Sequence, residues 1–150
     1  PQYLPGGPTE DIDADLRDTG TILAQAARNL DFGQPVAVML LGVLHCVPDS
    51  GDPAAIVARL VDAVPSGSYL TITHPASDVA ADQMAASMQK YNEHVTVPLT
   101  ARSHDEVSAF FAGLDLVEPG VVQLHRWRAG TGDPGTGREL ANYGGVGRKP

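Results

Sequence analysis

The stretch that decides the fold reads VAVMLLGVLHCVPDSGDP and covers residues 36–53. Its first part, Val36–Leu44, carries no charged side chain, and His45 and a turn rich in proline, aspartate and glycine follow it. The run is much shorter than the roughly 20 apolar residues that a membrane-spanning helix requires. Its β-branched start and the prolines on both sides instead predict a central parallel strand that is buried on both faces.

Helices and strands alternate on both sides of this strand. Asp52 followed by Pro53 has the pattern of an N-cap and a first-turn proline, so it predicts a helix. Ser68–Thr73 is predicted as the next strand, with His74 at its end. Upstream, Ile12–Leu16 alternates apolar and acidic residues, which predicts a short half-buried strand.

Three further helices are expected from their capping residues. The first begins at Asp18 or Thr19 and runs to about Asn29, and another is capped by Ser77 or Asp78. The third begins at residue 103, where a serine is followed three residues later by a glutamate, as in a capping box.

The last part of the sequence predicts an antiparallel finish. Leu114–Glu118 and Val121–Trp127 are separated only by Pro119 and Gly120, which indicates a hairpin. The glycine-rich segment Tyr143–Lys149 has the pattern of a lid or a docking strand, with a frayed terminus as the alternative. Together the segments predict an α/β fold, a mostly parallel open sheet that ends in a C-terminal antiparallel hairpin.

Composition limits the partners. The 150 residues carry a formal net charge of −8, and the pI is near 4.8, which argues against nucleic acid or an anionic membrane as a partner. A small-molecule substrate is therefore expected. The single cysteine and the absence of a signal-peptide pattern at the N-terminus favour a cytoplasmic location. We expect an irregular lead-in over residues 1–10, one α/β domain over 11–128 and a glycine-rich tail over 129–150.

Four stretches of the sequence resemble the actinobacterial S-adenosyl methyltransferase family, long catalogued as a domain of unknown function. They are DIDADLRD (11–18), the segment from FGQPVAVMLLG to YLTITH (32–74), RSHDEVSAFFAGLDLVEPGVVQLHRW (102–127) and YGGVGRK (143–149). The resemblance covers nearly the whole chain. It implies a Rossmann-like class I methyltransferase sheet and S-adenosyl-L-methionine as the cofactor.

The resemblance also implies that such an enzyme opens with a strand, a glycine-rich turn and a helix, followed by a second strand. No segment before Asp11 has this pattern, so the chain is expected to correspond to the C-terminal part of the family's fold. The strand at residues 36–44 would then have an unpaired edge, which a second copy of the chain or an N-terminal half could cover. Two functions follow from this: methyl transfer to an unidentified nucleophile, or a non-catalytic interaction or dimerisation module.

The acidic segment before the first helix carries the expected adenine contacts. By resemblance, Asp15 accepts a hydrogen bond from the adenine amino group, and the Leu16 backbone N–H lies near a ring nitrogen. Asp13 is the alternate to Asp15. The competing interpretation is that Asp13, Asp15 and Asp18 are only a solvated strand end and a helix cap.

The end of the strand at residues 36–44 carries the remaining candidates. By resemblance, Leu41, Gly42 and Val43 lie alongside the cofactor. His45 and His74 are the candidate catalytic residues, since either could accept a proton from the nucleophile. Both histidines could equally be structural residues that bond loop carbonyls. No metal site is expected, because the sequence lacks a metal-binding spacing.

Overall fold

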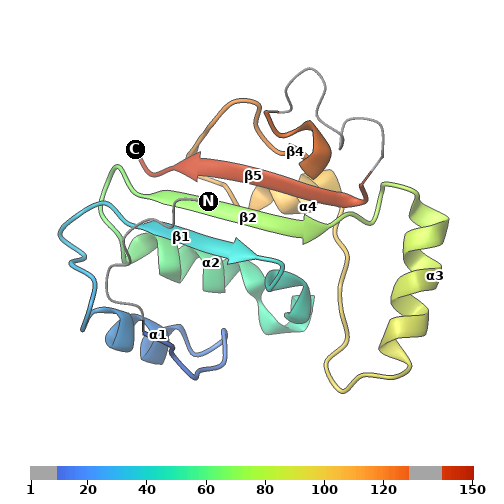
Figure 1. Cartoon of the computed structure of the whole chain (residues 1–150), viewed down its shortest axis with the longest axis horizontal. Helices are drawn as coiled ribbons and strands as arrows, with labels where there is room; N and C mark the ends of the chain where they lie inside the picture. Colours follow the sequence, from blue (N-terminus) through green and yellow to red (C-terminus); the bar gives the residue numbers. More distant parts are fainter. Residues whose placement is uncertain (1–9, 129–139) are drawn as a thin grey trace, which may run out of the picture.

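The computed structural model describes residues 10–128 and 140–150, and within them five strands form one mixed sheet (Figure 1). The strands are β1 (Ala37–Leu41), β2 (Tyr69–Pro75), β3 (Asp115–Leu116), β4 (Val122–Gln123) and β5 (Asn142–Arg148). Their order is β1-β2-β5-β3, and β4 also pairs with β5. Only β1 and β2 are parallel, and the pairs made by β5 are antiparallel. The predicted α/β class with an antiparallel C-terminal end is confirmed, but the sheet of the described residues is mixed and not mostly parallel, because β5 pairs antiparallel with each of its neighbours.

Helices α2 and α4 cover one face of this sheet. The helices of the described residues are α1 (Thr19–Ala26), α2 (Pro53–Asp62), α3 (Ala81–Asn92) and α4 (His104–Ala109), with short 3-10 turns η1 (Leu44–Cys46), η2 (Asp49–Gly51) and η3 (Leu124–Arg126). Side chains of α2 and of the α4 region form one core with Leu40, Leu70 and Ile72 of the sheet. Figure 1 shows α3 standing apart from the sheet, beyond the carboxyl end of β2.

The capping residues predicted from sequence begin three of the helices. Asp18 caps α1 by accepting a hydrogen bond from the Thr21 N–H, and Asp52 caps α2 with Pro53 as its first residue. The capping box of α4 is present with both of its reciprocal hydrogen bonds. These predictions are confirmed because a cap depends only on residues a few positions apart.

The predicted cap of α3 is wrong. This helix begins at Ala81, after Ala80 in a left-handed conformation, so neither Ser77 nor Asp78 caps it. The Asp78 carboxylate instead accepts hydrogen bonds from the Tyr143 hydroxyl at 2.8 Å and from the His104 N–H at 2.9 Å. Asp78 therefore joins α4 to β5 and serves tertiary structure.

The predicted strand Ile12–Leu16 is also absent, and a turn stands at its end. The Asp15 side chain accepts a hydrogen bond from the Arg17 N–H, and the Asp15 carbonyl accepts one from the Asp18 N–H. Such local hydrogen bonds by aspartate compete with strand pairing. The alternation of apolar and acidic residues thus marked a turn here.

Strand β1 is shorter and less buried than predicted. It ends at Leu41, and only Leu40 is buried, whereas Met39 is 59% exposed and Leu41 48% exposed. The prediction that this strand is buried on both faces was therefore wrong. In the described part of the chain α2 and α4 cover one face, and β1 lies at the edge of the sheet with β2 as its one neighbour. The predicted unpaired edge is confirmed for these residues.

The antiparallel end is built differently from the predicted hairpin. Strands β3 and β4 do not pair with each other, because β5 pairs with both, at Leu116↔Gly147 and Gln123↔Tyr143. The glycine-rich C-terminal segment is thus a docked strand. Of the predicted lead-in and tail, residues 1–9 and 129–139 lie outside the described residues.

Candidate functional site

The carboxyl ends of the parallel strands β1 and β2 meet at one edge of the sheet, where open α/β sheets bind their ligands. A hollow of about 470 Å³ lies beside the end of β1, within the usual size range of small-molecule sites. Three segments line it: Asp15, Leu16 and Arg17 before α1; Gly42, Val43, Cys46, Val47 and Pro48 after β1; and Thr96, Val97 and Pro98 after α3.

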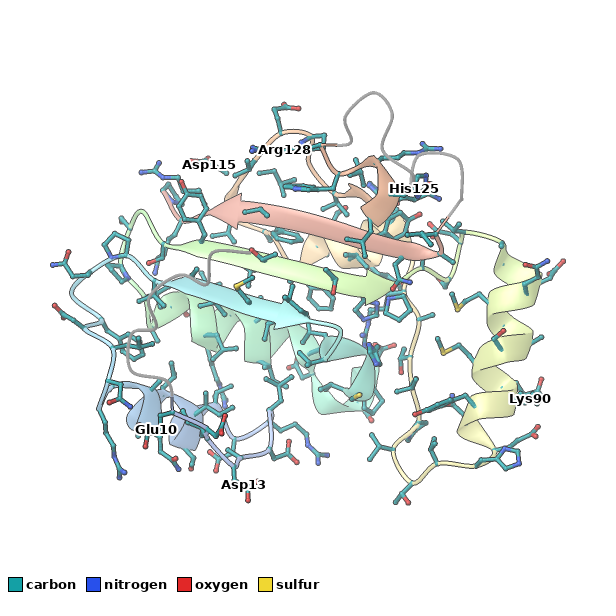
Figure 2. The ribbon with its side chains drawn as sticks, viewed as in Figure 1. Glu10, Asp13, Lys90, Asp115, His125 and Arg128 are labelled. Carbon is teal, nitrogen blue, oxygen red and sulfur yellow. The ribbon has the colours of Figure 1, made fainter. Side chains whose placement is uncertain are left out.

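The structure brings four of the predicted cofactor residues to this hollow. Asp15 and Leu16 line it together with Gly42 and Val43, although the two pairs are far apart in sequence. Leu41 is not among the lining residues, and its exposed side chain follows the alternation of β1. Asp13 is exposed too, and Figure 2 shows it pointing away from the sheet.

Asp15 presents an ionised acceptor at the hollow. Its carboxylate accepts hydrogen bonds from the backbone N–H, Nε and Nη2 of Arg17, and these bonds lower the pKa of Asp15 to about 2. A carboxylate can accept about four hydrogen bonds, so one acceptor position remains. The neighbouring Leu16 N–H donates to no acceptor in the described part of the chain.

Gly42 directly follows β1 and has a backbone conformation that other residues rarely adopt. Its φ is +62°, and its N–H donates to the Thr73 carbonyl at 3.3 Å, which extends the pairing with β2 by one residue. A Cβ placed on Gly42 would meet only the His45 Cε1 atom, at 3.9 Å. The glycine is therefore required by its backbone conformation.

His45 lies in η1, half-buried, behind Gly42. Its Nδ1 atom is buried and has no hydrogen-bond partner among the described residues. Burial, followed by the nearby charge of Arg102, lowers the pKa of His45. The ring stands perpendicular to that of His74, with 6.2 Å between the centroids.

His74 is fully buried and uses both ring nitrogens. Because an arginine can only donate, His74 Nε2 accepts from Arg102 Nη1 at 2.9 Å, and Nδ1–H donates to the Pro75 carbonyl at 3.0 Å. Burial is the main cause that lowers the pKa of His74 to about 4, with the charge of Arg102 acting in the same direction. The imidazole is therefore neutral near pH 7. Neither His45 nor His74 is among the residues that line the hollow.

Arg102 is a residue that the sequence analysis missed. It is only 3% exposed, and besides His74 its guanidinium bonds the Leu44 and Val47 carbonyls and Asp49. A signal was present in the sequence, since a cation beside the N-terminus of a helix is electrostatically unfavourable. Such a placement needs a compensating contact, and the loop after β1 provides it.

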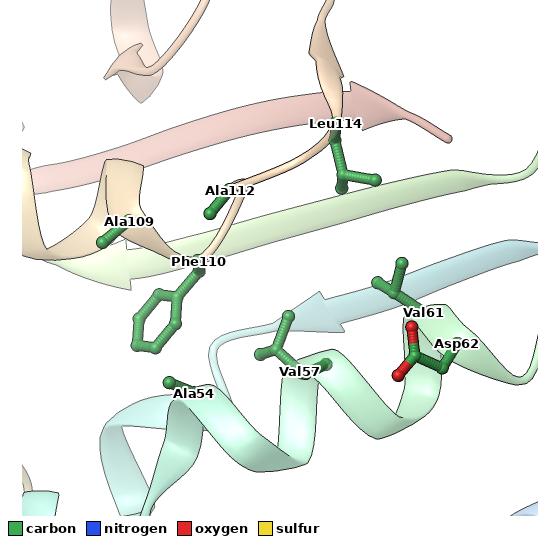
Figure 3. A pocket seen from close by; sticks show the side chains of 9 residues that line it. Ala54, Val57, Val61, Asp62, Ala109, Phe110, Ala112 and Leu114 are labelled. Carbon is green, nitrogen blue, oxygen red and sulfur yellow. The ribbon is translucent and has the colours of Figure 1, made fainter. Parts of the chain in front are cut away.

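A second hollow, of about 280 Å³, lies between α2 and α4 (Figure 3). Figure 3 shows Val57 and Phe110 at its sides and Asp62 as the one labelled carboxylate. It is mostly apolar and lies over the helical layer, away from the strand ends, so we assign it no chemistry.

No three histidine, cysteine, aspartate or glutamate side chains of residues 10–128 and 140–150 gather so that they could hold a metal ion. In the same residues no helix is both long and apolar enough to cross a membrane.

Comparison with known proteins identifies relatives of the whole chain. Residues 2–150 match a family model described as S-adenosyl methyltransferase. A crystal structure of a DUF574 family protein from Streptomyces avermitilis is 37% identical with a TM-score of 0.85, and it matches over 93% of this chain and 54% of its own. A putative methyltransferase from Thermobifida fusca is 32% identical with a TM-score of 0.77, over 91% of this chain and 52% of its own.

The chain therefore spans about half the length of these two solved structures. An O-methyltransferase family 2 protein from Planctomyces limnophilus is 17% identical with a TM-score of 0.50 over 81% of this chain, a likeness in fold alone. A search of the curated proteins returned no match.

Proposed function

Because the chain belongs to the S-adenosyl methyltransferase family, we propose that the hollow at the end of β1 binds the adenine part of S-adenosyl-L-methionine. One observation carries this proposal: Asp15 and Leu16 share the hollow with Gly42 and Val43. An ionised acceptor next to an available N–H donor matches the amino group and a ring nitrogen of adenine.

The proposed reaction is methyl transfer to a nitrogen, oxygen or sulfur nucleophile of a small molecule. Held in the hollow beside Asp15 and Leu16, S-adenosyl-L-methionine would supply its sulfonium methyl group to the nucleophile and would be released as S-adenosylhomocysteine. The protein's part is to hold the reactants in line and to exclude water. The nucleophile must also lose a proton to an acceptor.

His45 is the better candidate for that acceptor. Its lowered pKa keeps the imidazole neutral near pH 7, and the ring lies near Gly42, which lines the hollow. His74 is less suited, because the Arg102 guanidinium and the Pro75 carbonyl already bond its nitrogens. The catalytic role of either histidine stays a prediction.

Calorimetric titration with S-adenosylhomocysteine tests the binding site. If Asp15 accepts from adenine, Asp15→Ala weakens binding by about 10- to 100-fold, the usual worth of a hydrogen bond to a charged group. The matched control is Asp13→Ala, which removes an exposed carboxylate that does not line the hollow. Equal affinities for wild type and Asp15→Ala would reject the assignment, and weakening by Asp13→Ala alone would move the contact to Asp13.

A second candidate function is an interaction module without catalysis. The uncovered face of β1 and β2 favours it, since Met39 and Leu41 of β1 and Tyr69 of β2 are 59%, 48% and 41% exposed, and so does the edge of β1 that is unpaired in the described residues. An apolar edge of this kind is a surface on which another strand can pair. Stable self-association of the chain without measurable binding of S-adenosylhomocysteine would support this function over methyl transfer.

A further inference from the structure

The loop that forms one wall of the hollow is held in place by contacts with a distant part of the chain. Residues 43–49 follow β1 and contain η1, two extended residues and the first residue of η2. Within them, Val43, Cys46 and Val47 line the hollow. Within the loop, two short-range hydrogen bonds shape η1, from Cys46 N–H to Val43 and from Val47 N–H to Leu44. Bonds of this kind define a turn but do not fix where the turn lies relative to the sheet.

Arg102 supplies three long-range hydrogen bonds to this loop, beside one from the Thr100 N–H to the His45 carbonyl at 2.8 Å. Its Nη1 donates to the Leu44 carbonyl at 3.3 Å, and its Nη2 donates to the Val47 carbonyl at 2.9 Å and to Asp49 Oδ1 at 2.8 Å. The rigid guanidinium fork thus holds two carbonyls and one carboxylate of the same loop. Arginine suits this task because its planar donors are fixed relative to one another.

The arginine is itself anchored to β2. Its N–H donates to the Pro75 carbonyl at 3.1 Å, its carbonyl accepts from the Ser77 N–H at 2.9 Å, and Nη1 also donates to His74. The guanidinium carbon lies 5.6 Å from the centre of the Phe110 ring. The side chain is 4% exposed, so these contacts are shielded from water, whereas its partner Asp49 is 78% exposed.

From these contacts we propose that Arg102 is a positioning residue. It ties the loop after β1 to the end of β2 and so sets the position of the wall formed by Val43, Cys46 and Val47. The effect on ligand binding rests on the proposed function of the hollow. The role of Arg102 in holding the loop in place does not rest on that function, because it can be measured in the ligand-free chain.

The first test is hydrogen exchange of the ligand-free chain, followed by mass spectrometry of peptides that cover residues 43–51. Arg102→Gln is expected to speed exchange there by about tenfold or more, while peptides from β5 keep their wild-type rates. Arg59→Gln is the matched control, since Arg59 is exposed on α2. Wild-type exchange over residues 43–51 in Arg102→Gln would overturn the proposal.

A second variant keeps the test decisive if Arg102→Gln does not fold. Asp49→Ala removes one exposed acceptor and leaves the buried contacts of Arg102 in place, so the fold should survive. We expect a smaller rise in exchange, about threefold, confined to residues 47–51. Unchanged exchange in Asp49→Ala together with an unfolded Arg102→Gln would reject the proposal that Arg102 holds the loop in place.

The last measurement separates positioning from a merely structural role. The affinity for S-adenosylhomocysteine should fall about tenfold or more in Arg102→Gln, and Arg102→Lys should restore part of it, because an ammonium can still reach Val47 and Asp49. Faster exchange with unchanged affinity, or no rescue by lysine, would overturn positioning. If wild type does not bind S-adenosylhomocysteine but Arg102→Gln still speeds exchange over residues 43–51, the proposed function is wrong and Arg102 still holds the loop in place.

Discussion

At the residue scale, the buried pair of His74 and Arg102 makes stability depend on pH. The pKa of His74 is about 4 in the folded chain, against an ordinary value of 6.5. Between these values the unfolded chain binds a proton that the folded chain excludes, so stability is complete above pH 6.5 and is lost as the pH falls toward 4. The loss from His74 is on the order of 3 kcal/mol. Urea unfolding across this pH range measures it.

The His74→Gln variant isolates this contribution. It is expected to be less stable than wild type near pH 7, because Arg102 loses a good acceptor, but to lose less stability on acidification. His94, which is exposed just after the C-cap of α3, provides the control, and His94→Gln should keep the wild-type pH dependence. An identical pH dependence in His74→Gln and wild type would contradict the explanation.

These residues show how far sequence reasoning reached at the site. The family resemblance placed Asp15, Leu16, Gly42 and Val43 at one ligand, and the fold does bring the four together. Arg102 was missed because its role depends on partners far away in the chain. The local signal, a cation beside the N-terminus of α4, does not say which distant residues the arginine contacts.

At the element scale, β5 depends on glycines that let the residues after α4 approach its backbone. A Cβ on Gly147 would lie 2.9 Å from Phe111 Cδ1 and 3.0 Å from Leu114 Cβ. Gly147→Ala is therefore expected to reduce the free energy of unfolding by about 1–3 kcal/mol through overpacking. Thermal and urea unfolding of the variant measure the change.

The control for this substitution is Gly20→Ala in α1. A Cβ there meets only Asp18 Oδ1, at 3.6 Å, and alanine in a helix is favoured over glycine by about 0.5–1 kcal/mol. Gly20→Ala should therefore stabilise the chain slightly. If Gly147→Ala were also neutral or stabilising, close packing against β5 would not explain the glycine.

The elements differ in how well the sequence predicted them, for a physical reason. Caps such as Asp52 and Ser103 are local, so their residues suffice to predict them. Strand pairing joins distant residues, and the sequence placed 121–127 beside 114–118 because a turn pair separates them. In the structure β5 takes that place, since its glycines accept Phe111 and Leu114 against its backbone.

At the scale of the whole molecule, the uncovered edge of β1 is the feature with the largest consequence. In the described residues β1 pairs with β2 alone, and the apolar side chains of Met39 and Leu41 project from the face opposite the buried Leu40. Residues 37–41 contain no charge, proline or glycine that would discourage a further strand. The edge therefore favours pairing with another strand.

We propose that the chain, when present alone, pairs through this edge with a second copy. Light scattering should then give a mass near twice the chain mass of 15.7 kDa at high concentration and a lower mass on dilution. The double variant Met39→Lys and Leu41→Lys should remain monomeric, because lysines on an edge strand oppose pairing. The control places two lysines at the exposed Gln83 and Gln89 of α3 and should still dimerise. A monomer at every concentration, or dissociation by the control, would show that β1 is not the interface.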